Sequence, residues 1–318
     1  MKKFMNQPDT MLTESLQGFA AAHADLVSLH LEPNYLVRAK KAQNKVAVIS
    51  GGGSGHSGLL GYGMLDAVCP GYVFTSPSPD QMLAAAEAVE CGKGVLFIVK
   101  NYAGDVMNFE MAAEMLSCES ATVLTSDDVA VENSTYTTGR RGVAGTVIVE
   151  KVVGSLAETG ADLAACKALG DRVNRRTASM GVALTSCTVP AAGKPTFDLG
   201  EQELEMGVGI HGEPGRRREA MRPADEIVAD LVKAILHELA PAPGNDFAAT
   251  PLMELYLLYN SAARLLQSHG LIISRSLVGN YTTALDMAGA SITMCLLDDE
   301  IKQHWDSPVH TAALRWGM

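Results

Sequence analysis

The chain has 318 residues, of which 47% are hydrophobic and 19% are charged, and its formal net charge is −11. This length is enough for two domains, and the acidic balance argues against a general affinity for nucleic acid. We expect neither a membrane span nor a secretory signal, because no apolar run is long enough and no apolar stretch follows the two starting lysines. The six cysteines lack C-x-x-C spacing, which favours a reducing cytoplasm over a disulfide framework.

The first half of the chain alternates short apolar runs with segments rich in Ala, Leu, Met and Glu. The runs 45–50, 94–100 and 121–126 are nearly continuous in apolar character, as is typical of strands buried on both faces of a parallel sheet. Segments 79–89 and 106–116 between them predict helices. The alternation predicts an α/β domain over residues 1–178, built on a doubly wound, mostly parallel sheet.

Segment 142–158 has a mixed pattern. Its valines favour a strand, but Val143, Val147, Ile148 and Val152 also recur at helical spacing. We predict a helix here.

The second half has a different pattern and predicts an α+β domain over residues 179–318. Segments 180–190 and 204–210 are expected to be strands. Segment 225–239 predicts an amphipathic helix, and segment 251–270 predicts a second helix, which starts at a proline and ends before a glycine. We expect two further strands within 271–297, around a turn at "DMAGAS".

A glycine-rich stretch, "SGGGSGHSG", directly follows the first predicted strand and contains His56. Glycines at the carboxyl end of a strand let backbone N–H groups approach a small polar ligand closely. The alternative is a tight strand-to-helix turn without a ligand. The stretch matches neither a P-loop, since it lacks the Gly-Lys-Ser/Thr ending, nor a regular dinucleotide-binding fingerprint.

Polar residues also follow the second strand, in "KNYAGD". Lys100, Asn101 and Asp105 should lie on the sheet edge where open α/β folds bind ligands. Asp105 precedes a predicted helix, so its alternative role is that of an N-cap carboxylate.

His211 stands between glycines in "GVGIHGEPG", after a predicted strand. Taken singly, it is compatible with an ordinary loop histidine. The arginines at 216–218 are expected to form a solvated patch, with phosphate binding as the weaker alternative. The remaining histidines show no metal-ligand spacing, so no metal site is predicted.

Several longer motifs together resemble the dihydroxyacetone kinase K subunit family. They cover nearly the whole chain in order: "GGGSGH", "FTSPSPD", "KNYAGDVMNFE", "GRRGVAGT", "CTVPAAGKP", "GVGIHGEPG", "ATPLMELY", "LDMAGASIT" and "WDSPVHTAALRWG". The resemblance implies a cytoplasmic, homodimeric, two-domain subunit that binds dihydroxyacetone but holds no nucleotide. ADP or ATP with Mg is expected on a partner L subunit, with a phosphoryl-carrying M subunit as a further partner in a phosphotransferase system.

The resemblance also implies residue roles. His211 would attack the ketone carbon and hold the substrate as a hemiaminal, His56 would bond the substrate and assist proton transfer, and Asp105 would act as general base. Lys100 would contact the substrate, together with the loop residues Gly53, Ser54 and Gly55. Without its nucleotide-binding partner the chain is expected to be inactive.

The chain departs from the family pattern near 57–63, 117–121 and 239–247, where it is shorter, and it lacks the Glu-Pro that usually follows "GGGSGH". The altered loop after His56 keeps a second interpretation open. In it, the protein is a non-catalytic dihydroxyacetone sensor that engages a transcription factor. The presence of Asp105 favours the enzyme, because a sensor needs no general base.

Overall fold

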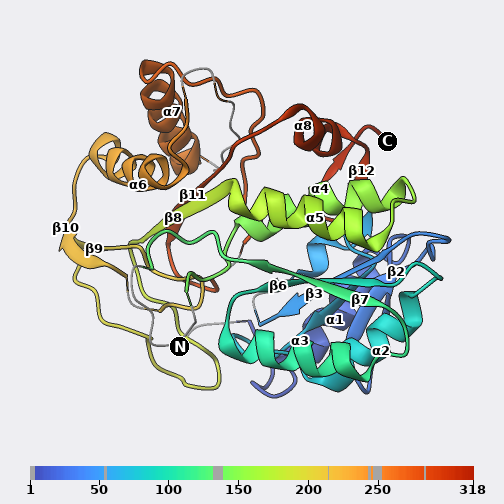
Figure 1. Ribbon diagram of the computed structural model, residues 1–318. Helices are drawn as coiled ribbons and strands as arrows, with labels where there is room; N and C mark the ends of the chain where they lie inside the picture. Colours follow the sequence, from blue (N-terminus) through green and yellow to red (C-terminus); the bar gives the residue numbers. More distant parts are fainter. Residues whose placement is uncertain are drawn as a thin grey trace.

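The computed structural model describes residues 4–53, 56–131, 139–213, 215–242, 245, 253–282 and 284–318. Its larger sheet has six strands, of which four run parallel, and two antiparallel strands continue one edge (Figure 1). The strand order is β1 (Val27–His30), β2 (Tyr35–Arg38), β5 (Ala67–Pro70), β3 (Ala47–Gly52), β6 (Val95–Lys100) and β7 (Ser120–Thr125).

Helices cover both faces of this sheet. α2 (Pro79–Val89) and α3 (Ala103–Met115) lie on one face, and α4 (Gly145–Glu158) and α5 (Leu163–Arg175) lie on the other. The short helix α1 (Met11–Ala22) contributes Leu16 to the same core as α4 and α5. This arrangement confirms the doubly wound, mostly parallel α/β architecture, and it explains why the central strands are apolar on both faces.

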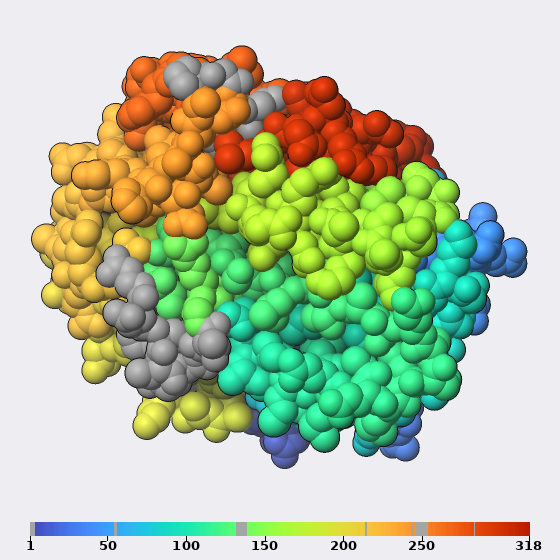
Figure 2. All heavy atoms as spheres, viewed as in Figure 1, coloured from blue at the N-terminus to red at the C-terminus, as the bar shows by residue number. Residues whose placement is uncertain are grey.

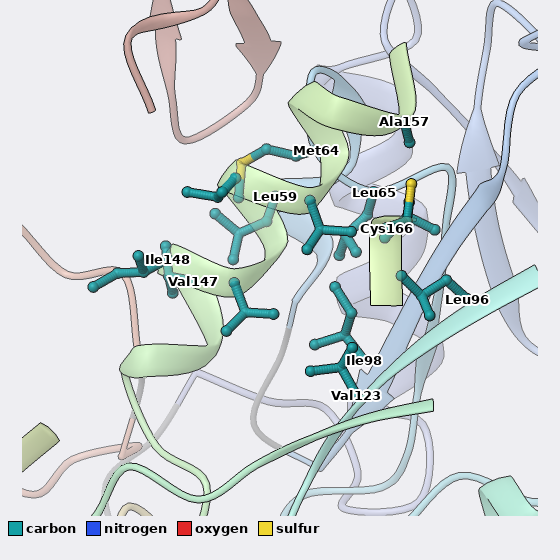
Figure 3. Close-up of a cluster of buried hydrophobic side chains, with 14 of the residues drawn as sticks. Leu59, Met64, Leu65, Leu96, Ile98, Val123, Val147, Ile148, Ala157 and Cys166 are labelled. Carbon is teal, nitrogen blue, oxygen red and sulfur yellow. The ribbon is translucent and has the colours of Figure 1, made fainter. Parts of the chain in front are cut away.

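Alternation along β6 shows how the sequence builds two cores at once. Phe97 packs with α2 and α3, whereas its neighbours Leu96 and Ile98 pack with α4 and α5. Figure 3 shows Leu96 and Ile98 in one cluster with Val147 and Ile148 of α4 and Cys166 of α5. The prediction of a helix for segment 142–158 is confirmed. Because α4 lies between the sheet and the rest of the protein, its valines are buried.

The second sheet is antiparallel throughout, with the strand order β10 (Arg217–Ala220), β9 (Glu203–Met206), β8 (Thr177–Ala183) and β11 (Gly289–Cys295). The helices α6 (Ala224–Leu239) and α7 (Met253–Ser268) pack on it through a separate apolar cluster. The predicted α+β character of the second half is therefore confirmed.

The end of the chain returns to the first half of the molecule and completes a third, three-stranded sheet. α8 (Asp299–Asp306) packs on α4, and β12 (Val309–Thr311) pairs with both β13 (Arg315–Trp316) and β4 (Gly61–Tyr62), which follows the short helix η1 (Ser57–Leu59). Figure 2 shows this red carboxy-terminal segment lying against the yellow-green helices. The division at residue 178 stays a prediction, and the last twenty residues share the apolar core of the first half.

Some predicted elements differ from the observed ones. Of the two strands expected within 271–297, only β11 is present, and the described part of 271–288 forms no strand. β9 ends at Met206 and not at 210, because Gly207 adopts a φ of 80° and turns the chain. No described helix is both long and apolar enough to cross a bilayer. The segment 239–247, where the chain is shorter than the family pattern, falls partly outside the described residues.

Candidate active site

The glycine-rich loop leaves the carboxyl end of β3 and lies against the segment that contains Phe74. Phe74 N–H donates to the Gly53 carbonyl at 3.0 Å, and a Cβ on Gly53 would lie 2.3 Å from the Thr75 nitrogen. No side chain fits at position 53, so a glycine there allows the two backbones to approach. Two predicted site residues of this loop, Ser54 and Gly55, lie outside the described residues.

Lys100, at the carboxyl end of β6, lies beside two other predicted site residues. Its Nζ contacts His56 Nε2, and both side chains are buried. A Cβ on Gly52 would lie 3.2 Å from Lys100 Nζ and 3.5 Å from Asp105 Oδ2, so these two atoms border the same small space. Burial lowers the pKa of Lys100, and the negative charges of Asp105, Glu150 and Asp127 oppose that change.

Asp105 is buried in the first turn of α3, at its third residue. The N-cap position belongs to Tyr102, so the alternative role of Asp105 as the N-cap carboxylate is wrong. A carboxylate in the first helical turn is favoured by the helix dipole. The Asp105 carboxylate therefore lies buried next to Lys100 and does not serve as the N-cap of α3.

His56 has a different partner on each ring nitrogen. Nε2 faces Lys100, and Nδ1 lies 2.9 Å from Oε1 of Glu150, a fully buried carboxylate on α4. Within the described residues this second contact is a close approach of the imidazole and the carboxylate without an aligned hydrogen bond. His56 is thus enclosed between a cation and an anion.

The His211 loop follows β9 and folds back on itself around Glu213. His211 N–H donates to Glu213 Oε2 at 2.9 Å, and His211 Nδ1 lies 3.3 Å from Oε1 of the same carboxylate. A Cβ on Gly209 would lie 2.1 Å from Glu213 Oε2 and 2.6 Å from Arg141 Nη1. The bare backbone at Gly209 is therefore what lets the carboxylate reach the imidazole.

Two aromatic rings from the first half hold the His211 ring. Its centroid lies 4.7 Å from that of Phe74 and 4.6 Å from that of Tyr102, within the range of favourable aromatic contacts. Phe74 borders the Gly53 loop, and Tyr102 caps the helix that carries Asp105. His211 Nε2 is buried and has no hydrogen-bond partner among the described residues.

The charges around His211 favour an ionised Glu213. Burial works to raise the pKa of Glu213, but the His211 imidazole and the Arg141 guanidinium together outweigh it, and the pKa lies below its ordinary value. Arg141 is itself paired with Asp128, at 2.7 Å. Burial raises the pKa of Asp128 to about 6, and Arg141 acts in the opposite direction.

The structure therefore places the predicted residues in two neighbouring groups. One contains Lys100, His56 and Asp105, and the other contains His211, which contacts Tyr102 and Phe74 beside the first group. A hollow of about 440 Å³ shares Gly209 and Ile210 with the His211 loop, but none of the four predicted chemical residues lines it. No group of three or more His, Cys, Asp or Glu side chains in the described ranges could hold a metal ion.

The arginine cluster after the His211 loop is accounted for by protein contacts. Arg217 and Arg218 lie on the exposed strand β10 and pair with nearby carboxylates such as Asp230 and Glu205. Arg216 donates to the carbonyls of Val129 and Ala130. The expected solvated patch therefore fits Arg217 and Arg218, whereas Arg216 joins the two halves of the chain.

Sequence reasoning missed four residues around the two histidines: Phe74, Tyr102, Glu150 and Glu213. Three of them stand inside the motifs "FTSPSPD", "KNYAGD" and "GIHGEPG", where nothing marks one residue over its neighbours. Glu150 did carry a signal. It interrupts the apolar run "TVIVEKVV", and a charge in the middle of a buried helix needs a partner.

Comparisons with known proteins agree with the motifs. The family model described as the Dak1 domain matches residues 17–313. The chain is 45% identical to the dihydroxyacetone-binding subunit DhaK of the PEP-dependent dihydroxyacetone kinase of Escherichia coli K12. That alignment extends over 356 residues and covers 100% of both chains, so it contains gaps in this shorter chain, as the departures from the family pattern suggest.

Two solved structures share the fold. The dihydroxyacetone kinase of C. freundii has a TM-score of 0.86 and 32% identity, over 99% of this chain and 60% of that longer one. A protein described as the dihydroxyacetone kinase operon co-activator DhaQ has a TM-score of 0.85 and 32% identity, over 94% of this chain and 96% of the other.

Proposed function

The chain belongs to the Dak1 domain family, and we propose that it is the dihydroxyacetone-binding subunit of a dihydroxyacetone phosphotransferase. The observation that carries the proposal is the His211 ring, which is fixed between Phe74 and Tyr102 while its buried Nε2 has no partner among the described residues. A neutral imidazole nitrogen in this setting is available as a nucleophile.

In the proposed binding step, Nε2 of His211 attacks the ketone carbon of dihydroxyacetone. The N–C bond forms as the carbonyl π bond breaks, and the former carbonyl oxygen takes a proton that passes from the Lys100 ammonium through Nε2 of His56. Solvent then restores the proton on Lys100. Positive charge develops on the ring and is stabilised by the ionised Glu213, 3.3 Å from Nδ1. Loss of the Nδ1 proton to solvent gives a neutral hemiaminal. Glycerol has no electrophilic carbon, so it cannot form this adduct.

In the proposed transfer step, Asp105 takes the proton from a terminal hydroxyl of the bound ketose as that oxygen attacks the phosphoryl group. Lys100 lies between Asp105 and His56 and supplies positive charge to the substrate oxygens. The phosphoryl donor is a nucleotide held with magnesium on a separate L subunit. Phosphoryl transfer depends mainly on positioning and charge stabilisation, which suits a site of this kind.

The experiment is a reconstitution with a nucleotide-binding L subunit. The purified chain with ATP and dihydroxyacetone should form no dihydroxyacetone phosphate. The product should appear once the L subunit is added. Phosphorylation by the homogeneous chain alone would overturn the two-component proposal.

The rival proposal, a ligand sensor, is supported by the altered loop after His56 and by the likeness to the co-activator, at 32% identity. The 45% identity to a kinase subunit and the presence of a buried Asp105 favour the enzyme. Intact ligand binding without any turnover beside a competent L subunit would favour the sensor instead.

A further inference from the structure

Glu150 is a buried carboxylate to which the proposed chemistry gives no role. It lies in the middle of α4 with none of its surface exposed, among apolar neighbours such as Val149 and Val152. Neither carboxylate oxygen has an aligned hydrogen bond among the described residues. A carboxylate removed from water in this way is costly unless cationic groups face it.

The groups that face Glu150 belong to the candidate site. Nδ1 of His56 lies 2.9 Å from Oε1, and the Lys100 ammonium interacts favourably with the same carboxylate. Lys100 also contacts the opposite nitrogen of His56. The three side chains therefore form a row, Glu150, His56 and Lys100, with the imidazole in the centre and a different partner on each of its nitrogens.

We propose that Glu150 is a positioning residue for His56. Which ring nitrogen of a histidine carries the proton is set by what the other nitrogen contacts. Glu150 holds the proton on Nδ1, so that Nε2 is the nitrogen turned toward Lys100 and the substrate. This inference rests on the proposed function: with its own proton on Nδ1, His56 presents a free Nε2, which accepts a proton from the Lys100 ammonium and passes it to the ketose oxygen.

The competing explanation is that Glu150 serves only as a counter-charge for Lys100. A double-mutant cycle separates the two, because residues that act through one another are not additive. Turnover with the L subunit is measured for the wild type, Glu150→Gln, His56→Ala and the double variant. We expect Glu150→Gln to lower turnover roughly 10- to 100-fold, less than the ~10²–10⁴-fold that a proton-transfer group contributes. In the His56→Ala background the same change should have almost no effect. An equal loss in both backgrounds would overturn the proposal.

A second readout does not need activity. In the ¹⁵N NMR spectrum of the substrate-free protein, His56 should show a protonated Nδ1 and an unprotonated Nε2, and Glu150→Leu should abolish this preference. If the leucine variant does not fold, Glu150→Met provides the same comparison, because its thioether has a similar length and is only a weak acceptor. A wild-type ring protonated at Nε2 alone, or a preference unchanged by the substitution, would contradict the inference. If the wild type transfers no phosphate but shows the expected tautomer, the proposed function fails and the positioning role stands.

Glu158→Gln is the matched control. Glu158 lies two turns further along α4 and accepts hydrogen bonds from Arg38 at 2.6 Å and Lys45 at 3.3 Å. Its substitution should lower thermal stability without changing the His56 resonances. A change in those resonances as large as that of the Glu150 variants would show a general effect of helix α4, and the proposal would fall.

Discussion

The two histidines of the candidate site have the same kind of partner on one nitrogen and opposite surroundings elsewhere. A carboxylate faces Nδ1 in both, Glu150 at 2.9 Å from His56 and Glu213 at 3.3 Å from His211. The His56 ring then meets a lysine, whereas the His211 ring meets two aromatic side chains. A charged environment suits proton transfer, and an aromatic one leaves Nε2 of His211 available for bond formation.

Replacing each histidine in turn should have the largest effect and tests whether His56 and His211 have different roles. His211→Ala should abolish the dihydroxyacetone adduct, because no other nucleophile is held in its place. His56→Ala should still form the adduct, but more slowly. Intact-mass spectrometry under mild conditions checks both, with glycerol as the ligand that adds to neither. Equal adduct formation by wild type and His211→Ala would contradict the assignment.

Asp105→Asn should separate binding from transfer. Asparagine keeps the shape of the side chain but cannot take a proton at neutral pH, so single-turnover transfer from the L-bound nucleotide should fall ~10²–10⁴-fold, or about 3–5 kcal/mol of barrier. The His211 adduct should persist. A transfer rate within a few-fold of wild type would leave Asp105 with a structural role only.

The ion pair beneath the His211 loop gives a pH-dependent test. Burial raises the pKa of Asp128 from 3.8 to about 6, so the folded state binds a proton more tightly than the unfolded state between these values. The contribution of Asp128 to the free energy of unfolding should therefore grow as the pH falls from 7 to 4, by up to about 3 kcal/mol. Urea unfolding of the wild type and Asp128→Asn at pH 7, 5 and 4 measures it. If the free energy of unfolding of the wild type, relative to that of Asp128→Asn, falls as the pH is lowered from 7 to 4, the Asp128 carboxylate stays ionised in its pair with Arg141 and the prediction is wrong.

Tyr102→Phe should have the smallest effect. The Tyr102 hydroxyl is buried without a hydrogen-bond partner among the described residues, and burial raises the pKa of this side chain, with Glu213 adding to the effect. Removing an unsatisfied hydroxyl while keeping the ring against His211 should leave the free energy of unfolding unchanged or raise it by up to about 1 kcal/mol. Tyr102→Leu, which also removes the ring, is the comparison. A clear loss of stability in the phenylalanine variant would show that the hydroxyl has a structural partner.

Much of the first half could be predicted because the physical signals are local. Apolar runs such as 94–100 are buried on both faces by adjacent helices, and the glycines at the end of β3 mark the carboxyl edge of the sheet, where open α/β folds bind ligands. The strand expected near 271 could not be corrected from the sequence, since short apolar runs have the same pattern in strands and in extended loops.

The candidate site shows the same limit. His211 can be singled out through the resemblance of its motif "GVGIHGEPG" to the family, but its aromatic partners come from positions more than 100 residues earlier in the chain. Their contact depends on how the antiparallel sheet sits against the parallel one, through bonds such as Ser179 N–H to the Asp127 carbonyl at 2.7 Å. Periodicity carries no information about such long-range contacts.

The central claim is that a ketose is bound covalently through Nε2 of His211, and a crystal structure of the wild-type protein soaked with dihydroxyacetone tests it most directly. The account predicts continuous density from Nε2 to the central carbon of the ligand, with tetrahedral geometry at that carbon and Glu213 beside Nδ1. A planar ketone at van der Waals distance from the ring, or a ligand bound away from His211, would contradict it.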